Sequence, residues 1–249
     1  MGHAWRRLDK ISRLCKVYLG LVAFSLAGSA VSRLTGLDPG PIAPITAALT
    51  LLTGFAAAFA PVWHAIGPGR SLLAGAVVLA VGSASEIVGL YTGLPFGRYA
   101  YTDAWFPTVP LPGDHHFPLL LPFAWFLMAG SAYLVVSRFA LRNREAGTRP
   151  PLWVIPGGAV LAAALDVPME PVMTEVLGYW VWVDPTWPIG GPILGTPLMN
   201  AVGWVATSLV AGWVLHSVSA YRASAREPGV VLVGHMVLVL GMGLIGGPR

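Results

Sequence analysis

The sequence predicts an all-α membrane protein, a polytopic bundle of about seven transmembrane helices. Of its 249 residues, 55% are hydrophobic and 10% are charged, whereas a soluble domain usually carries about 25% charged residues. The apolar residues form continuous runs of about 20 residues, the length that one helix needs to cross a bilayer. In the strands of a membrane barrel, apolar and polar residues alternate. The runs in this sequence show no such alternation. We therefore expect one multi-pass transmembrane domain over residues 1–249.

Seven apolar runs are long enough to span, and the polar, proline-rich stretches between them predict loops. The predicted spans are 17–34, 42–64, 71–91, 117–138, 152–171, 193–220 and 230–246. The first run also has the basic start and the small residues (AGSA, 27–30) of a signal peptide. Cleavage there would leave six spans in the same orientation.

The distribution of basic residues predicts the orientation, because lysine and arginine accumulate on the cytoplasmic side of a membrane protein. With the N-terminus inside, the outer side carries only Arg33, Arg98 and Arg249, and the other twelve of the 15 basic residues lie inside. We therefore expect the N-terminus inside and the C-terminus outside. The positive charge follows from topology, so no nucleic-acid partner is expected.

Four polar side chains are predicted to lie at one depth, about 5 to 10 Å below the outer surface. They are Glu86 near the outer end of the third span, Asp166 and Glu170 on the fifth, and Asn200 in the first turns of the sixth. Asp166 and Glu170 share a helical face because they are four residues apart. Acids within spans usually face a cavity or a partner. Without a cation beside it, a desolvated carboxyl group favours its protonated form, which is the form that a general acid needs.

Prolines and aromatic residues surround these acids in the sequence. Pro168 and Pro171 predict that the fifth helix is broken beside a cavity, with a simple packing kink as the alternative. The rings of the two outer loops and of the sixth span are candidates for binding a long apolar molecule or facing a cation. An interfacial aromatic belt is the alternative for part of them. The candidate substrate-binding residues are Tyr91, Phe96, Tyr99, Tyr101, Trp180, Trp182 and Trp204.

Other kinds of site are poorly supported. His115 and His116 in an outer loop are expected to be a solvated pair and not metal ligands, and no role is expected for His64, His216 or His235. The chain lacks the phosphate-binding loop, the dinucleotide fingerprint and the nucleophile elbow, and the aspartate-rich motifs of prenyl transferases. Its only lysines, Lys10 and Lys16, precede the first span, which excludes a retinal Schiff base in a late helix.

Two long blocks resemble the CruF-type carotenoid hydratases, integral membrane proteins of carotenoid-producing bacteria and haloarchaea. The first is EIVGLYTGLPFGRYAYTD, followed by FPLLLPFAWFLMAGSAYLV. The second is ALDVPMEPVMTEVLGYWVW, followed by GGPILGTPLMNAVGWV. The resemblance covers about residues 80 to 210. One departure is that Glu170 stands where the family pattern has an aspartate before the second proline.

The resemblance implies that water adds to the terminal 1,2 double bond of a linear ψ-end carotenoid, such as lycopene or γ-carotene. It implies a multi-pass protein of a bacterial or archaeal cell membrane that takes its carotenoid from the bilayer, among membrane lipids, with no redox cofactor. Association with other carotenoid biosynthesis enzymes is a further expectation. Asp166 is the first candidate proton donor and Glu86 the second. Glu170 is a further candidate acid or base, and Asn200 is a candidate for holding the water.

Two other functions remain open from the sequence. A membrane-type lycopene cyclase protonates the same end group but excludes water from the cation. A carotenoid-binding or transport protein would not need the acids for chemistry, although transporters often show repeated halves and no repeat is visible here.

Overall fold

The computed structural model describes residues 11–145, 147–186, 195–223 and 226–246 and shows an all-α bundle, as predicted. Six helical segments in the described residues are long and apolar enough to cross a membrane, and a further helix, α6, carries the two acids Asp166 and Glu170. The helices are α1 (Arg13–Thr35), α2 (Ile42–Ile66), α3 (Pro68–Thr92), α4 (Leu121–Trp125), α5 (Ser131–Leu141), α6 (Val154–Pro171), α7 (Leu198–Ser217) and α8 (Glu227–Gly246). A π-helical turn, Phe126–Gly130, joins α4 to α5 in one span.

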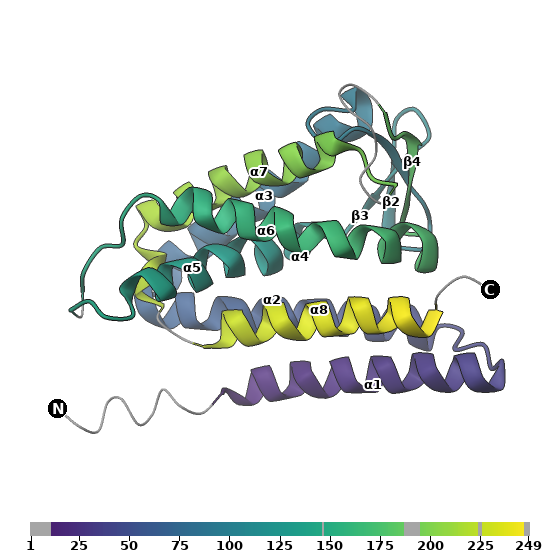
Figure 1. The fold of residues 1–249 in the computed structure, drawn as a ribbon, viewed down its shortest axis with the longest axis horizontal. Coiled ribbons are helices and arrows are strands. Elements are labelled where there is room, and N and C mark those ends of the chain that lie inside the picture. The colour runs from purple at the N-terminus through teal and green to yellow at the C-terminus, as the bar shows by residue number, and fades with distance from the viewer. Residues whose placement is uncertain (1–10, 146, 187–194, 224–225, 247–249) are drawn as a thin grey trace.

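The helices run roughly parallel to the long axis of the molecule (Figure 1). The first helix begins at one end and the last helix finishes at the other, as an odd number of crossings requires. All four strands gather at the end where α8 finishes (Figure 1). The predicted outer loops therefore lie together at this end of the bundle.

The fourth and sixth helices start later than the predicted spans. The fourth does not begin at 117, because Phe117 and Pro118 belong to a strand and the helix starts at Leu121. The predicted start of the sixth span, 193, lies outside the described residues, and its helix begins at Leu198 after the extended Pro197. The predicted break in the fifth helix is also displaced: α6 runs through Pro168, and the irregularity is a π-helical turn at Val172–Val176.

The outer loops contain two small antiparallel sheets that were not predicted. Strand β1 (Arg98–Tyr101) pairs with β4 (Trp180–Asp184), and β2 (Thr108–Leu111) pairs with β3 (His115–Pro118). In the first sheet Tyr99 lies opposite Trp182, and Tyr101 lies opposite Trp180. Because side chains alternate across a strand, these four rings share one face, while Val181 and Val183 point outward and are half or more exposed.

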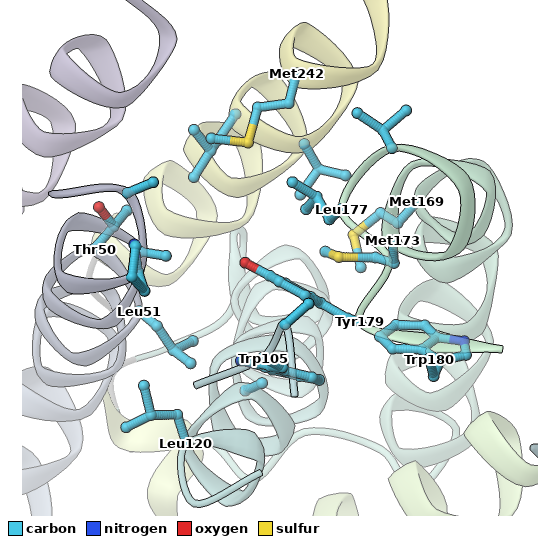
Figure 2. A pocket seen from close by; sticks show the side chains of 18 of the residues that line it. Thr50, Leu51, Trp105, Leu120, Met169, Met173, Leu177, Tyr179, Trp180 and Met242 are labelled. Carbon is cyan, nitrogen blue, oxygen red and sulfur yellow. The ribbon is translucent and has the colours of Figure 1, made fainter. Parts of the chain in front are cut away.

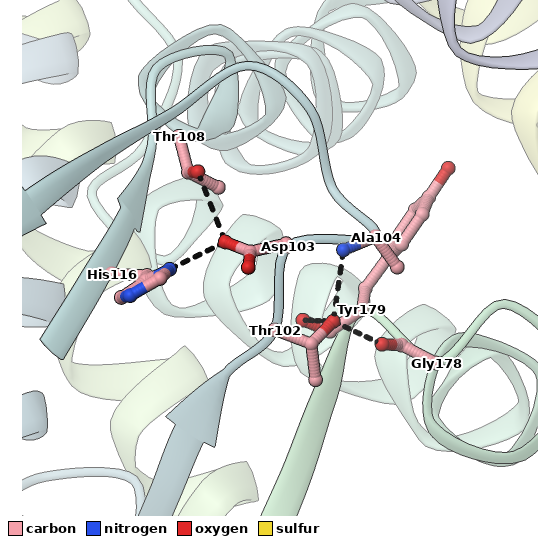
Figure 3. A network of polar contacts seen from close by, with 7 residues as sticks. All are labelled: Thr102, Asp103, Ala104, Thr108, His116, Gly178 and Tyr179. Atoms are coloured by element: carbon pink, nitrogen blue, oxygen red, sulfur yellow. Dashed lines mark hydrogen bonds and ion pairs between the residues drawn. The ribbon is translucent and has the colours of Figure 1, made fainter. Parts of the chain in front are cut away.

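A polar network ties the segment after β1 to the start of β4 (Figure 3). The Thr102 hydroxyl donates to the carbonyl of Gly178, and its backbone N–H donates to the carbonyl of Tyr179. The Asp103 carboxylate accepts from Thr108 and contacts His116 Nδ1, which links this segment to the second sheet. The network fixes Trp105 against Tyr179, whose rings stack with centroids 5.0 Å apart.

The Tyr18 side chain fills the space between α1, α2 and α8 in the half of the bundle far from the strands. Its ring fits between Gly54 and Gly234, where an added Cβ would approach it to 2.9 and 2.8 Å. Its hydroxyl donates to the carbonyl of Val231 at 3.0 Å. Beyond this point toward the strands, the same three helices line a cavity whose wall on α1 begins at Phe24.

Candidate functional site

A cavity of about 700 Å³ lies between the group α1, α2 and α8 and the group α3, α4 and α6. Figure 2 shows its wall, with Thr50 and Leu51 on one side, Met169 and Met173 on the other, and Met242 from α8. Trp105 and Tyr179 reach into it from the strand end. The volume is in the range of pockets that take small ligands. Most of the lining side chains are apolar, so the cavity suits an apolar molecule.

The four predicted polar residues all line this cavity. The exposed fractions of Glu86, Asp166, Glu170 and Asn200 are 7, 3, 2 and 4%. Carboxyl groups this buried need hydrogen-bond partners. The partners that the structure provides are neutral for each of the three acids.

Glu86 on α3 receives hydrogen bonds from three rings. The hydroxyls of Tyr99 and Tyr101 both donate to Oε2, the second at 2.8 Å, and the indole N–H of Trp125 donates to Oε1 at 3.1 Å. Gly82, one turn earlier on α3, lets the Trp125 ring approach, since an added Cβ would lie 2.4 Å from it. Both oxygens of this carboxyl group are therefore occupied.

Asn200 joins Asp166 and Glu170. Its side-chain nitrogen donates to Asp166 Oδ2 at 2.7 Å and to Glu170 Oε1 at 2.8 Å. Pro197 ends the preceding segment and places Asn200 in the first turn of α7, facing α6. Because an amide nitrogen has two hydrogens, the pair of bonds uses its whole donating capacity. Asn200 thus clamps the two acids together.

Glu170 has two more donors, and both come from the β1–β4 sheet. The indole N–H groups of Trp180 and Trp182 donate to Oε2 at 3.3 and 3.2 Å. Asp166 differs, because its Oδ1 makes no hydrogen bond to any of the described residues. Asp166 therefore has one donor, whereas Glu86 and Glu170 have three each.

The β1–β4 sheet therefore serves two carboxyl groups, with the tyrosines of β1 bonded to Glu86 and the tryptophans of β4 bonded to Glu170. Tyr99 and Trp182 are in edge contact with ring centroids 5.6 Å apart, and Tyr101 and Trp180 are 6.1 Å apart. Burial and the nearby Glu86 carboxyl group raise the pKa values of Tyr99 and Tyr101 well above the usual value for tyrosine. Both hydroxyls therefore stay neutral donors over the physiological pH range.

Six of the seven predicted substrate-binding rings line the cavity: Phe96, Tyr99, Tyr101, Trp180, Trp182 and Trp204. Tyr91 does not. It is 49% exposed, its hydroxyl donates to the carbonyl of Pro112, and its ring packs on His115.

Three further cavity residues are not among the predicted site residues. Trp125 lies within one of the quoted blocks; it packs against Trp204 with ring centroids 4.4 Å apart and donates a hydrogen bond to Glu86. Tyr179 directly precedes the WVW pattern of β4. His235, for which no role was expected, lines the same cavity from α8. The period-two patterns YAY and WVW were the available signal for the paired strands.

The two histidines of β3 contact other side chains. His116 contacts Asp103, and His115 lies against Tyr91. Within the described ranges, no three residues among histidine, cysteine, aspartate and glutamate are grouped as a metal ion requires.

Comparison with known proteins identifies the family. A family model described as "Carotenoid biosynthesis protein" matches residues 46–247, most of the chain. The chain belongs to the carotenoid biosynthesis protein family. It is also similar to a bisanhydrobacterioruberin hydratase from Haloarcula japonica, with 31% identity over 126 residues. That match covers 51% of this chain and 38% of the relative. No solved structure matches the chain.

Membership of the family confirms the resemblance to carotenoid hydratases that the two sequence blocks predicted. Together with the six helices that are able to span a bilayer, it identifies the chain as a membrane protein. In this family member, the two blocks contribute Glu86, Asp166, Glu170 and Asn200 to one cavity.

Proposed function

We propose that this protein is a cofactor-independent carotenoid 1,2-hydratase, which adds water to the terminal 1,2 double bond of a linear ψ-end carotenoid such as lycopene or γ-carotene. The observation that carries the proposal is the group of three buried carboxyl groups on the wall of one apolar cavity, each of which accepts hydrogen bonds from neutral donors among the described residues. The family and the hydratase relative support the same substrate class.

Asp166 is the proposed proton donor. Hydrogen bonds that a carboxyl group accepts stabilise its ionised form. Glu86 and Glu170 accept three such bonds from side chains and Asp166 accepts one. Of the three, Asp166 therefore holds a proton best, and its Oδ1 is free of protein partners within the described residues. Two carboxyl groups in unlike surroundings can divide the roles of acid and base.

The chemistry begins with transfer of the Asp166 proton to C2, the less substituted alkene carbon. The π electrons form the new C2–H bond, and the positive charge develops on C1, which carries two methyl groups. Water then forms the C1–O bond and loses one proton. That proton returns to the Asp166–Glu170 pair and restores its starting state. The product is a tertiary 1-hydroxy carotenoid, and no oxidant or reductant is consumed.

The rings around the acids favour the charged intermediate. An aromatic face stabilises a desolvated cation by about 2 kcal/mol. Tyr101, Trp180 and Trp182 line the cavity beside Glu86 and Glu170. The carboxylates add a Coulombic contribution that is larger in an apolar cavity than in water. Both effects act on the cation and not on the neutral alkene, as catalysis requires.

Pigment analysis in a lycopene-accumulating host tests the proposal. Expression of this chain should convert lycopene into a pigment that is heavier by one water and carries a tertiary hydroxyl group. A cyclised pigment of unchanged mass would identify a cyclase instead. Unchanged lycopene that copurifies with the protein would indicate a binding or transport protein.

A further inference from the structure

His235 is a polar group in the cavity wall that the chemistry above leaves unused. It lies on α8 and lines the same cavity as the acids. Its ring makes no hydrogen bond to any residue in the part of the chain that the structure describes. A neutral imidazole has one N–H donor and one acceptor nitrogen. Because His235 is partly exposed and lines the cavity, its ring nitrogens are available to a molecule inside it.

His235 and Asp166 lie at about the same depth. Helix α8 and the segment formed by α6 and its π-helical turn pack side by side, with Gly246 against Val176 and Gly243 against Val172. His235 is eleven residues before Gly246, and Asp166 is ten residues before Val176. At about 1.5 Å per residue, the two side chains start about 15–17 Å from the strand end. They thus face the inner part of one cavity from neighbouring helices.

The water-binding group must accept a hydrogen bond from the water and then take its proton. Asn200 holds Asp166 and Glu170 through its amide nitrogen, and Thr50 donates its hydroxyl hydrogen to the carbonyl of Thr46 on its own helix. Neither an amide oxygen nor a hydroxyl is basic enough to keep a proton at neutral pH, whereas an imidazole nitrogen is. Tyr179 reaches the cavity from the strand end, beside Trp105 (Figure 2). His235 is the group at the level of Asp166 with unsatisfied ring nitrogens.

We propose that His235 binds the water molecule that captures the carbocation, an inference that rests on the proposed hydration. The acceptor nitrogen of the ring takes a hydrogen bond from the water, which leaves an oxygen lone pair directed at C1. As the C1–O bond forms, the water O–H bond that points at the ring breaks, and its proton moves to the imidazole nitrogen. It then passes through water in the cavity to the Asp166 carboxylate. Acid and water-binding group therefore approach the double bond from two different helices.

The reaction in deuterated water separates protonation from water capture. The purified wild-type protein should give an alcohol with deuterium at C2. In His235→Leu, we expect about 100-fold less alcohol, but the recovered alkene should carry deuterium in its end group, because the uncaptured cation loses a proton back to Asp166. His235→Gln should recover part of the alcohol, since an amide also binds water. Asp166→Asn should give neither alcohol nor labelled alkene.

His64→Leu is the matched control, because His64 is exposed on α2 and lies outside the cavity. It should behave as wild type in both measurements. Alcohol formation by folded His235→Leu at the wild-type rate would overturn the role of His235 while leaving the hydratase assignment intact. Loss of both alcohol and deuterium exchange in that folded variant would also overturn it, because His235 would then act in protonation. Failure of the hydration proposal itself shows differently, as absence of alcohol from the wild-type protein.

Discussion

Tyr99 and Trp182 lie opposite each other in the β1–β4 sheet with ring centroids 5.6 Å apart, and they donate hydrogen bonds to two different carboxyl groups, Glu86 and Glu170. Two segments far apart in the sequence are thus joined by four pairs of residues in the sheet. The sheet fixes the rings, and the rings fix the acids. A short strand pair outside the helices therefore sets the geometry of a site within the bundle.

Removing one donor while keeping the aromatic ring tests this arrangement. Trp182→Phe deletes one of the three hydrogen bonds to Glu170. A hydrogen bond to a charged group contributes about 1.5–3 kcal/mol, so we expect product formation to fall by about 10-fold or more. Trp213→Phe is the control, because Trp213 is 59% exposed on α7. Equal rates for the two variants would show that the sheet does not tune Glu170.

Asp166→Asn should abolish product formation, with a loss of about 100-fold or more. Asparagine keeps the size of the side chain but has no carboxyl proton to transfer. Glu86→Gln should be less severe, because Glu86 is the second candidate donor. Asp38→Asn, at an exposed position between α1 and α2, is the control. Retained product formation in both Asp166→Asn and Glu86→Gln would refute acid catalysis by these groups.

Gly82→Ala should displace Trp125 from Glu86. The added Cβ would lie 2.4 to 2.7 Å from three atoms of the Trp125 side chain, which is only 2% exposed and packs against Trp204. Overpacking of this kind costs about 1–3 kcal/mol of stability, and product formation should fall with it. In Gly20→Ala the new Cβ meets nothing within 4 Å, so that variant should unfold at or above the wild-type temperature in detergent. A wild-type melting temperature for Gly82→Ala would contradict the packing described here.

The tyrosines of the site should resist ionisation. Burial is the first cause that raises the pKa values of Tyr99, Tyr101 and Tyr179, so the folded protein keeps their protons where an unfolded chain, with a pKa of about 10, loses them. Their contribution to stability is therefore complete below about pH 10 and is lost as the pH rises further. A spectroscopic titration of tyrosinate should show fewer ionised groups in the folded protein than in the denatured one. Ionisation of all seven tyrosines together near pH 10 in the folded state would contradict this.

Hydrophobic run length was sufficient to predict the helices, because a bilayer-spanning helix must be long and apolar along its whole length. Counting residues from the outer ends of three spans also predicted that Glu86, Asp166, Glu170 and Asn200 lie at one depth. The structure brings these four residues to one cavity. The strands were not predicted, because four or five residues such as RYAY and WVWVD are too short to stand out beside an aromatic belt. Their pairing joins distant segments, and no local pattern specifies that contact.

His235 shows a second limit of sequence reasoning. Counted from the start of α8, it falls in the inner half of the span, which suggested a place away from the acids. The cavity lined by α1, α2 and α8 on one side and by α3, α4 and α6 on the other extends to that depth. Depth along one helix does not reveal how far a space between helices reaches.

The origin of the product's oxygen tests the central claim most directly. Purified protein should be incubated with lycopene in isotopically labelled water, without added reductant, and the product analysed by mass spectrometry. Acid-catalysed hydration predicts a tertiary alcohol that carries one oxygen atom from the labelled water. A product whose oxygen comes from molecular oxygen, or a cyclised product with no oxygen, would contradict the account.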